Sequence, residues 1–272
     1  MQQSTDIQAL LQWQLAMGAD EAIAEQPTNH LLEKEEKVTP LVTQAASPRP
    51  ADKPAAQTKA SSPPQSAPQN SSLSETIEQA KVLAQQASTL EALKEALMQF
   101  DGCPLKKTAR HTVFAEGAPD SHIMFIGEAP GADEDRSGVP FCGASGQLLD
   151  KMLSAIQLNR HENCYITNTL FWRPPGNRSP TPEEIEICRP FVERHIELFA
   201  PKLIVLLGGT ASKALLQESR GIMKLRTQPL SYQEIPVRAT FHPSYLLRQP
   251  LQKKQAWQDL LAIRALIDDI AA

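Results

Sequence analysis

KLIVLLG, the stretch at residues 202–208, decides the fold class of this chain. Five apolar residues followed by a glycine are typical of a strand that is buried on both faces of a parallel sheet. Three runs of the same kind accompany it, namely HIMFIG at 122–127, NCYIT at 163–167 and PVRATF at 236–241. The sequence therefore predicts four buried strands in the second half of the chain.

Helical patterns separate these runs. They lie at about 145–157, 182–199, 209–217 and 252–270, and Pro182-Glu183-Glu184 suits a helix first turn. Strands that alternate with helices predict an α/β fold, a three-layer sandwich with a central four-stranded parallel sheet flanked by helices. The stretch 218–235 is interpreted as an irregular excursion before the last strand.

The first part of the chain is organised differently. A short helix is expected at 5–24, within a segment 1–37, and seven prolines among Ala, Ser and Gln make 38–72 a flexible linker. Helical periodicity resumes after residue 72, so we expect the main domain at 73–272. The segment 1–37 is interpreted either as a weakly ordered extension or as a docking element for a partner protein.

Charge and cysteine content limit the function classes. The net charge is −4; residues 1–99 carry 7 Lys and Arg against 12 Asp and Glu, whereas residues 100–272 carry 20 against 19. A DNA-binding role would therefore depend on local clusters of Arg and Lys rather than on overall charge.

No run of 18 apolar residues and no basic, apolar leader is present, so we expect a cytoplasmic protein that does not enter a membrane. In that reducing compartment the four cysteines are expected to be free thiols or metal ligands.

An unusual polar or glycine-rich segment follows each predicted strand. These segments are Gly127-Glu128-Ala129-Pro130-Gly131, Asn168 with Arg173-Pro174-Pro175-Gly176-Asn177-Arg178, Gly208-Gly209-Thr210, and His242-Pro243-Ser244. Ligands of such sheets bind beyond the carboxyl ends of the strands. Four such endings at one edge predict a functional cleft there.

Several of these segments resemble the motifs of family 4 uracil-DNA glycosylases. They are GEAPGADED (127–135), GVPFCGASGQLLD (138–150), ITNTLFWRPPGNRSPTPEEI (166–185) and HPSYLLR (242–248), in the family's order. The resemblance covers about residues 100–265. It implies an enzyme that removes uracil from DNA and leaves an abasic site, and we expect this enzyme to be a monomer.

The resemblance also implies roles for single residues. Glu128 would shape the pocket floor and exclude the 5-methyl group of thymine, with Gly127 and Ala129 beside it in the substrate site. Phe141 would stack on the extruded uracil, and the amide of Asn168 would read its edge. His242 would contact uracil O2 and stabilise the departing anion.

Other positions would hold the DNA or activate water. Arg173 and Arg178 lie in a proline-rich loop suited to a phosphate clamp, and Ser244 and Arg248 would hold further phosphates. Related glycosylases place an Asp where this chain has Ala129, so no general base is assigned, and leaving-group stabilisation is expected to dominate.

The cysteines depart from the family pattern. Family 4 enzymes usually hold a [4Fe–4S] cluster on four Cys, of which this chain matches only Cys103 and Cys188. Phe100 and Trp172 occupy the other two ligand positions. Two thiolates cannot replace a four-Cys cage, so we expect apolar packing in place of the cluster, with an incomplete or differently ligated cluster as the alternative.

Two other functions stay open at this point. The same fold could act on another deaminated base such as hypoxanthine or xanthine, because Cys142 stands beside Phe141. The absence of a carboxylate at Ala129 would also fit a non-catalytic nucleic-acid-binding module. A relative that traps DNA covalently is disfavoured, because no basic insertion with a reactive His precedes the last strand.

Overall fold

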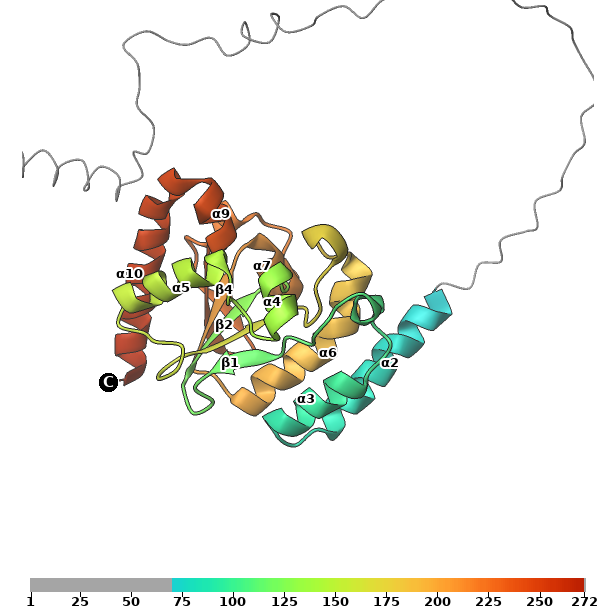
Figure 1. The fold of residues 1–272 in the computed structure, drawn as a ribbon. Helices are drawn as coiled ribbons and strands as arrows, with labels where there is room; N and C mark the ends of the chain where they lie inside the picture. The colour runs from blue at the N-terminus through green and yellow to red at the C-terminus, as the bar shows by residue number, and fades with distance from the viewer. Residues whose placement is uncertain (1–69, 272) are drawn as a thin grey trace, which may run out of the picture. The chain divides into compact units, whose positions relative to one another are not determined.

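A computed structural model describes residues 70–271, and their strands form one sheet (Figure 1). The strand order is β1-β3-β2-β4-β6-β5. The strands are β1 (Ala115–Gly117), β2 (Ile123–Gly127), β3 (Tyr165–Asn168), β4 (Leu203–Leu207), β5 (Leu230–Tyr232) and β6 (Ile235–Thr240). The four predicted strands correspond to β2, β3, β4 and β6.

The centre of the sheet is parallel, as predicted, but its edges are not. β2 pairs in parallel with β3 and β4, and β4 pairs in parallel with β6. β1 pairs antiparallel with β3, and β5 pairs antiparallel with β6. The predicted count of four strands is therefore corrected to six across the described part of the chain. Both additional strands are three residues long, which is too short for an alternating pattern to be recognised.

Helices cover both faces of the sheet (Figure 1). They are α2 (Asn70–Gln86), α3 (Leu90–Gln99), α4 (Ala132–Ser137), α5 (Ala144–Ala155), α6 (Pro182–Phe199), α7 (Gly209–Leu216), α8 (Ile222–Leu225), α9 (Pro243–Arg248) and α10 (Lys253–Ala271). Short 3-10 turns add η1 (Pro104–Lys107), η2 (Pro175–Asn177) and η3 (Pro250–Gln252). The four predicted helices are confirmed as α5, α6, α7 and α10.

Two separate hydrophobic cores show why the fold has three layers. In β2, Met124 and Ile126 join the core that contains α2, α3 and α6, whereas Ile123 and Phe125 join the core that contains α5 and α10. Side chains alternate between the faces of a strand, so a fully apolar strand supplies both cores. The predicted three-layer arrangement is confirmed.

Boundaries differ from the prediction in two places. Helix α2 begins at Asn70, three residues before the expected start of the domain, and the stretch 218–235 contains α8 and β5. The predicted segment 1–37 and the predicted linker up to residue 69 lie outside the described residues. No helix within residues 70–271 is long and apolar enough to cross a membrane.

Candidate active site

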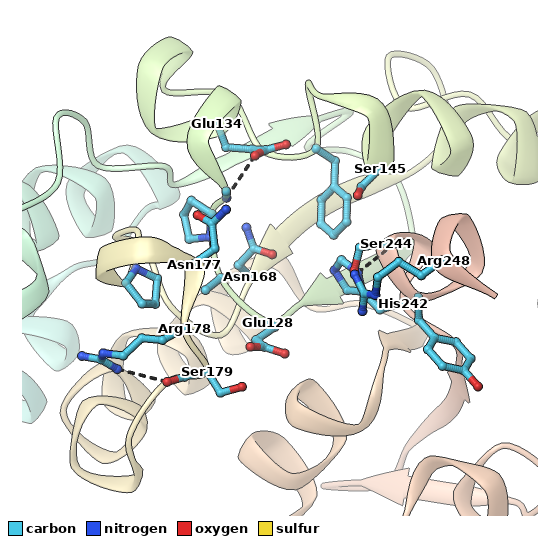
Figure 2. Close-up of a pocket in the computed structure, with 16 residues that line it drawn as sticks. Glu128, Glu134, Ser145, Asn168, Asn177, Arg178, Ser179, His242, Ser244 and Arg248 are labelled. Atoms are coloured by element: carbon cyan, nitrogen blue, oxygen red, sulfur yellow. Dashed lines mark hydrogen bonds between the residues drawn. The ribbon is translucent and has the colours of Figure 1, made fainter. Parts of the chain in front are cut away.

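A pocket with a volume of about 410 Å³ opens at the carboxyl edge of the parallel strands. The predicted site residues that line it are Glu128, Ala129, Phe141, Asn168, Arg178, His242, Ser244 and Arg248. Figure 2 shows His242 and Ser244 together on one side and Arg178 with Ser179 on another. The structure thus brings together eight of the ten predicted residues, while Gly127 and Arg173 do not line the pocket.

Gly127 lies directly behind the pocket. It pairs with Asn168 across β2 and β3. A β-carbon at Gly127 would lie 2.3 Å from Oδ1 of Asn168 and 2.6 Å from Cζ of Phe141. No larger residue fits, so Gly127 allows these two side chains to meet at the pocket floor.

Asn168 presents an unused hydrogen-bond acceptor. The residue is 1% exposed, and its Oδ1 has no partner among the described residues. Buried polar atoms are nearly always paired, and this one lies on the pocket wall. A ligand that donates a hydrogen bond would satisfy it.

Phe141 supplies an aromatic wall beside His242. The centroids of the two rings are 5.5 Å apart and their planes are tilted by 34°. The backbone of Phe141 has a φ of 52°, in the left-handed region that bulky residues rarely adopt. The loop before α5 therefore aims this ring through an unusual backbone conformation.

Glu134, which the sequence analysis missed, joins two loops of the pocket. Its Oε2 accepts a hydrogen bond from the N–H of Gly131 at 3.0 Å, and its Oε1 accepts one from the N–H of Gly143 at 3.2 Å. An acidic residue three positions after a helix N-cap is a recognisable signal, although Gly131 is a weak cap residue. Other missed lining residues are Ser145, Asn177, Ser179 and Tyr245.

His242 is fixed as a neutral ring in one tautomer. Its Nδ1 lies 3.1 Å from the backbone nitrogen of Ser244 and 2.7 Å from the Ser244 hydroxyl. A backbone N–H can only donate, so Nδ1 accepts and the ring proton is on Nε2. Burial, with a smaller contribution from Arg248, lowers the pKa of His242 to about 4. The imidazole is therefore a neutral Nε2–H donor at physiological pH.

Gly208, at the end of β4, leaves room for this histidine. A β-carbon there would lie 3.0 Å from Cβ of His242, and the φ of Gly208 is +97°. Its N–H donates to the carbonyl of Thr240 at 2.8 Å, which joins the ends of β4 and β6. Close approach of these two strand ends places His242 at the pocket.

The predicted DNA-binding arginines differ in their partners. Arg178 forms a two-pronged ion pair with Glu184, at 2.9 and 2.6 Å. Nε of Arg173 donates to Oδ1 of Asn177 at 2.7 Å. Arg248 is exposed and lines the pocket. Of these three side chains, Arg178 is paired with an acid, whereas neither Arg173 nor Arg248 has an acidic partner in the part of the chain that the structure describes.

Cys103 and Cys188 lie together in the core, away from the pocket. Both are fully buried, and their thiols are hydrogen-bonded to each other. This bond lowers the pKa of Cys103 and, together with burial, raises that of Cys188. Within residues 70–271, no group of three or more Cys, His, Asp or Glu side chains could hold a metal ion.

Aromatic residues stand at the other two predicted ligand positions and belong to the same hydrophobic core as these thiols. Phe100 and Trp172 are each 1% exposed, and the Phe100 ring lies 5.2 Å from that of Phe191. Nε1 of Trp172 donates to the hydroxyl of Thr112 at 3.0 Å. Two cysteines in a core of packed rings do not fit a [4Fe–4S] cluster, which needs four thiolate ligands.

Comparison with known proteins shows which family this chain resembles. A sequence profile of the uracil DNA glycosylase superfamily matches residues 114–261. A type-4 uracil-DNA glycosylase from Thermotoga maritima is 40% identical over 164 residues, which are 58% of this chain and 83% of the relative. One from Sulfurisphaera tokodaii is 37% identical over 186 residues, covering 65% and 84% of the two chains. One from Archaeoglobus fulgidus is also 37% identical over 186 residues, covering 65% and 93%.

These matches span the strands, the loops and the pocket described above, and they agree with the resemblance found in the motifs. The chain therefore belongs to the uracil DNA glycosylase superfamily, within its type-4 family.

Proposed function

We propose that this protein hydrolyses the N-glycosidic bond of uracil in DNA and leaves an abasic site. The observation that carries the proposal is the meeting of three groups in one pocket: the unpaired amide oxygen of Asn168, the ring of Phe141 and the neutral His242. The type-4 relatives are uracil-DNA glycosylases, which is the same activity.

The pocket suits the edge and the face of uracil. Oδ1 of Asn168 can accept a hydrogen bond from the N3–H of uracil, and the amide nitrogen of Asn168 can donate one to O4 of uracil. Uracil must leave the base stack to reach these groups, and the ring of Phe141 replaces part of the lost stacking. Glu128, on the pocket wall, would exclude the 5-methyl group of thymine.

His242 would act on the leaving group. Cleavage of the glycosidic bond develops negative charge on uracil, including O2. The Nε2–H of His242 is already oriented by Ser244, so it can donate to O2 without a change of tautomer. A donor held in place in this way lowers the barrier because it needs no reorganisation during the reaction.

Water attack is assigned no general base. Ala129 lines the pocket and has no ionisable side chain. Leaving-group stabilisation by His242 and Asn168 therefore carries most of the proposed rate acceleration. No step involves an iron–sulfur cluster, since Cys103 and Cys188 do not supply its ligands.

DNA would be held at the rim of the pocket. Arg248 and the backbone at Ser244 would contact phosphates, and the loop with Arg173 and Arg178 would add contacts through backbone and polar atoms. We also propose that the enzyme is a monomer and that it works in the cytoplasm. A partner protein for the segment 1–37 stays a prediction from sequence.

A uracil-excision assay tests the proposal. We expect the wild type to release uracil from a labelled oligonucleotide, and we expect His242→Ala to be slower by on the order of 100- to 1000-fold. His122→Ala is the matched control, because His122 is exposed and precedes β2 at the opposite edge of the sheet.

Two outcomes would contradict the proposal. Undiminished release by both His242→Ala and Asn168→Ala would place the chemistry outside this pocket. The second outcome is measured on a panel of oligonucleotides that each carry one lesion. Release of hypoxanthine or xanthine without release of uracil would assign a different substrate.

A further inference from the structure

We propose that Arg160 is a positioning residue that sets the uracil-stacking ring of Phe141 by holding the backbone of its loop from behind. The inference rests on the proposed function, because it is that function which gives Phe141 the role of stacking on uracil. Arg160 lies in the turn between α5 and β3 and does not line the pocket. Its side chain is 7% exposed, which is unusual for an arginine.

The guanidinium of Arg160 binds two successive carbonyls. Nη1 donates to the carbonyl of Pro140 at 3.1 Å, and Nη2 donates to the carbonyl of Phe141 at 3.0 Å. These carbonyls lie on either side of the φ and ψ angles of Phe141. Bonds to both restrict the backbone that aims the ring.

That backbone needs support because of its conformation. A φ of 52° is unfavourable for a residue with a large side chain. The adjacent helix also makes room for it: a β-carbon at Gly146 would lie 1.6 Å from the Phe141 carbonyl oxygen. Gly146 admits the carbonyl, and Arg160 bonds it there.

Two carboxylates hold the guanidinium in turn. Glu116 Oε2 lies 2.7 Å from Nη1, and Asp150 Oδ1 lies 2.7 Å from Nε. Burial opposes the charge on Arg160, but these two partners raise its pKa above the usual value. The planar fork is therefore fully engaged, and β1, α5 and the Phe141 loop are joined through one side chain.

The ring of Phe141 has little freedom to absorb a shift of this loop. It reaches Gly127 on one side, and its centroid is 5.5 Å from that of His242 on the other. A displacement of about 1 Å in a substrate-positioning group can cost about 100-fold in rate. We therefore expect a change at Arg160 to weaken excision although Arg160 does not touch the base.

Arg160→Lys tests this, because lysine keeps the charge but cannot donate in a fork to two carbonyls. We expect kcat/KM for uracil excision to fall by about 10- to 100-fold. Arg264→Lys is the matched control, since Arg264 also bonds a carbonyl, that of Ile156, and pairs with Asp268 on α10. The control is expected to keep wild-type activity.

A double-mutant cycle separates positioning from a general loss of stability. If Arg160 acts through Phe141, Arg160→Lys should have little further effect in a Phe141→Ala background. Equal effects of Arg160→Lys in both backgrounds would overturn the inference, as would wild-type activity of the single variant. If Arg160→Lys does not fold, Glu116→Gln replaces it in the same cycle; wild-type activity of Glu116→Gln would then overturn the inference.

Failure of the proposed function has a different signature. A wild type that releases no uracil would contradict that function without testing Arg160. In that case the crystal structure of Arg160→Lys decides the inference, because an unchanged Phe141 backbone and ring would overturn it.

Discussion

Ser244 donates two hydrogen bonds to Nδ1 of His242, one from its backbone N–H at 3.1 Å and one from its hydroxyl at 2.7 Å. His242 is also the N-cap residue of α9, so the ring is held by the first turn of the helix that follows it. The tautomer of His242 is thus set by Ser244, two positions later in the chain, and not by a distant acidic side chain.

The first prediction concerns pH. With a pKa of about 4, His242 is neutral well above that value. We expect the single-turnover excision rate to stay level from neutral pH down to about pH 5 and then to fall, because a protonated Nδ1 can no longer accept from the backbone N–H of Ser244. Circular dichroism at each pH would separate this fall from unfolding. A rate that rises as the pH falls below neutrality would indicate a charged imidazole in catalysis.

The second prediction concerns Gly208. In Gly208→Ala the new methyl group would meet Cβ of His242 at 3.0 Å in a left-handed backbone. We expect a loss of about 1–2 kcal/mol in the free energy of unfolding and at least a tenfold fall in excision rate. Gly209→Ala is the control, because its β-carbon would be 3.8 Å from Cβ of Ile222. Equal behaviour of the two variants would contradict the proposed contact.

The third prediction distinguishes the two arginines of the pocket rim. The charge of Arg178 is already paired with Glu184, whereas Arg248 has no acidic partner within residues 70–271. In binding to uracil-free duplex DNA, Arg248→Ala should reduce the slope of log affinity against log salt by about 1, and Arg178→Ala should reduce it less. The reverse order would mean that Arg178 leaves Glu184 when DNA binds.

The fourth prediction concerns iron. Because Phe100 and Trp172 are buried in the same core as Cys103 and Cys188 and supply no thiolate, we expect anaerobically purified protein to contain no stoichiometric iron or sulfide. Treatment with a chelator should leave both the melting temperature and the excision rate unchanged. A stoichiometric cluster with its visible absorption band would contradict this expectation.

Long apolar runs made the parallel strands at the centre of the sheet predictable. The two edge strands and several side-chain contacts were not predictable. β2 and β4 are buried at every position, so their runs stand out from the sequence. β1 and β5 have partly exposed residues and three positions each, which leaves no pattern to detect. Tertiary pairing, not local propensity, defines these two strands.

Eight of the pocket residues were predictable because each stands in a family motif that follows or ends a strand. What those motifs do not reveal is how side chains pair. Arg178 is predicted to clamp phosphate, and its motif does not reveal that its guanidinium pairs with Glu184. Arg160 lies in a turn with no recognisable pattern, and its bond to Phe141 spans 19 residues. The left-handed backbone of Phe141 likewise depends on these distant contacts.

The order of the strands has a consequence for synthesis of the protein. Asn168 is the last residue of β3, whereas His242 follows β6, which pairs with β4 and is the last of the described strands to leave the ribosome. A nascent chain that has emerged only through β4 contains Phe141 and Asn168 without the histidine. The growing polypeptide therefore has no complete pocket until the residues that follow β6 have been made, so a product truncated before His242 contains the base-recognition groups without the leaving-group donor.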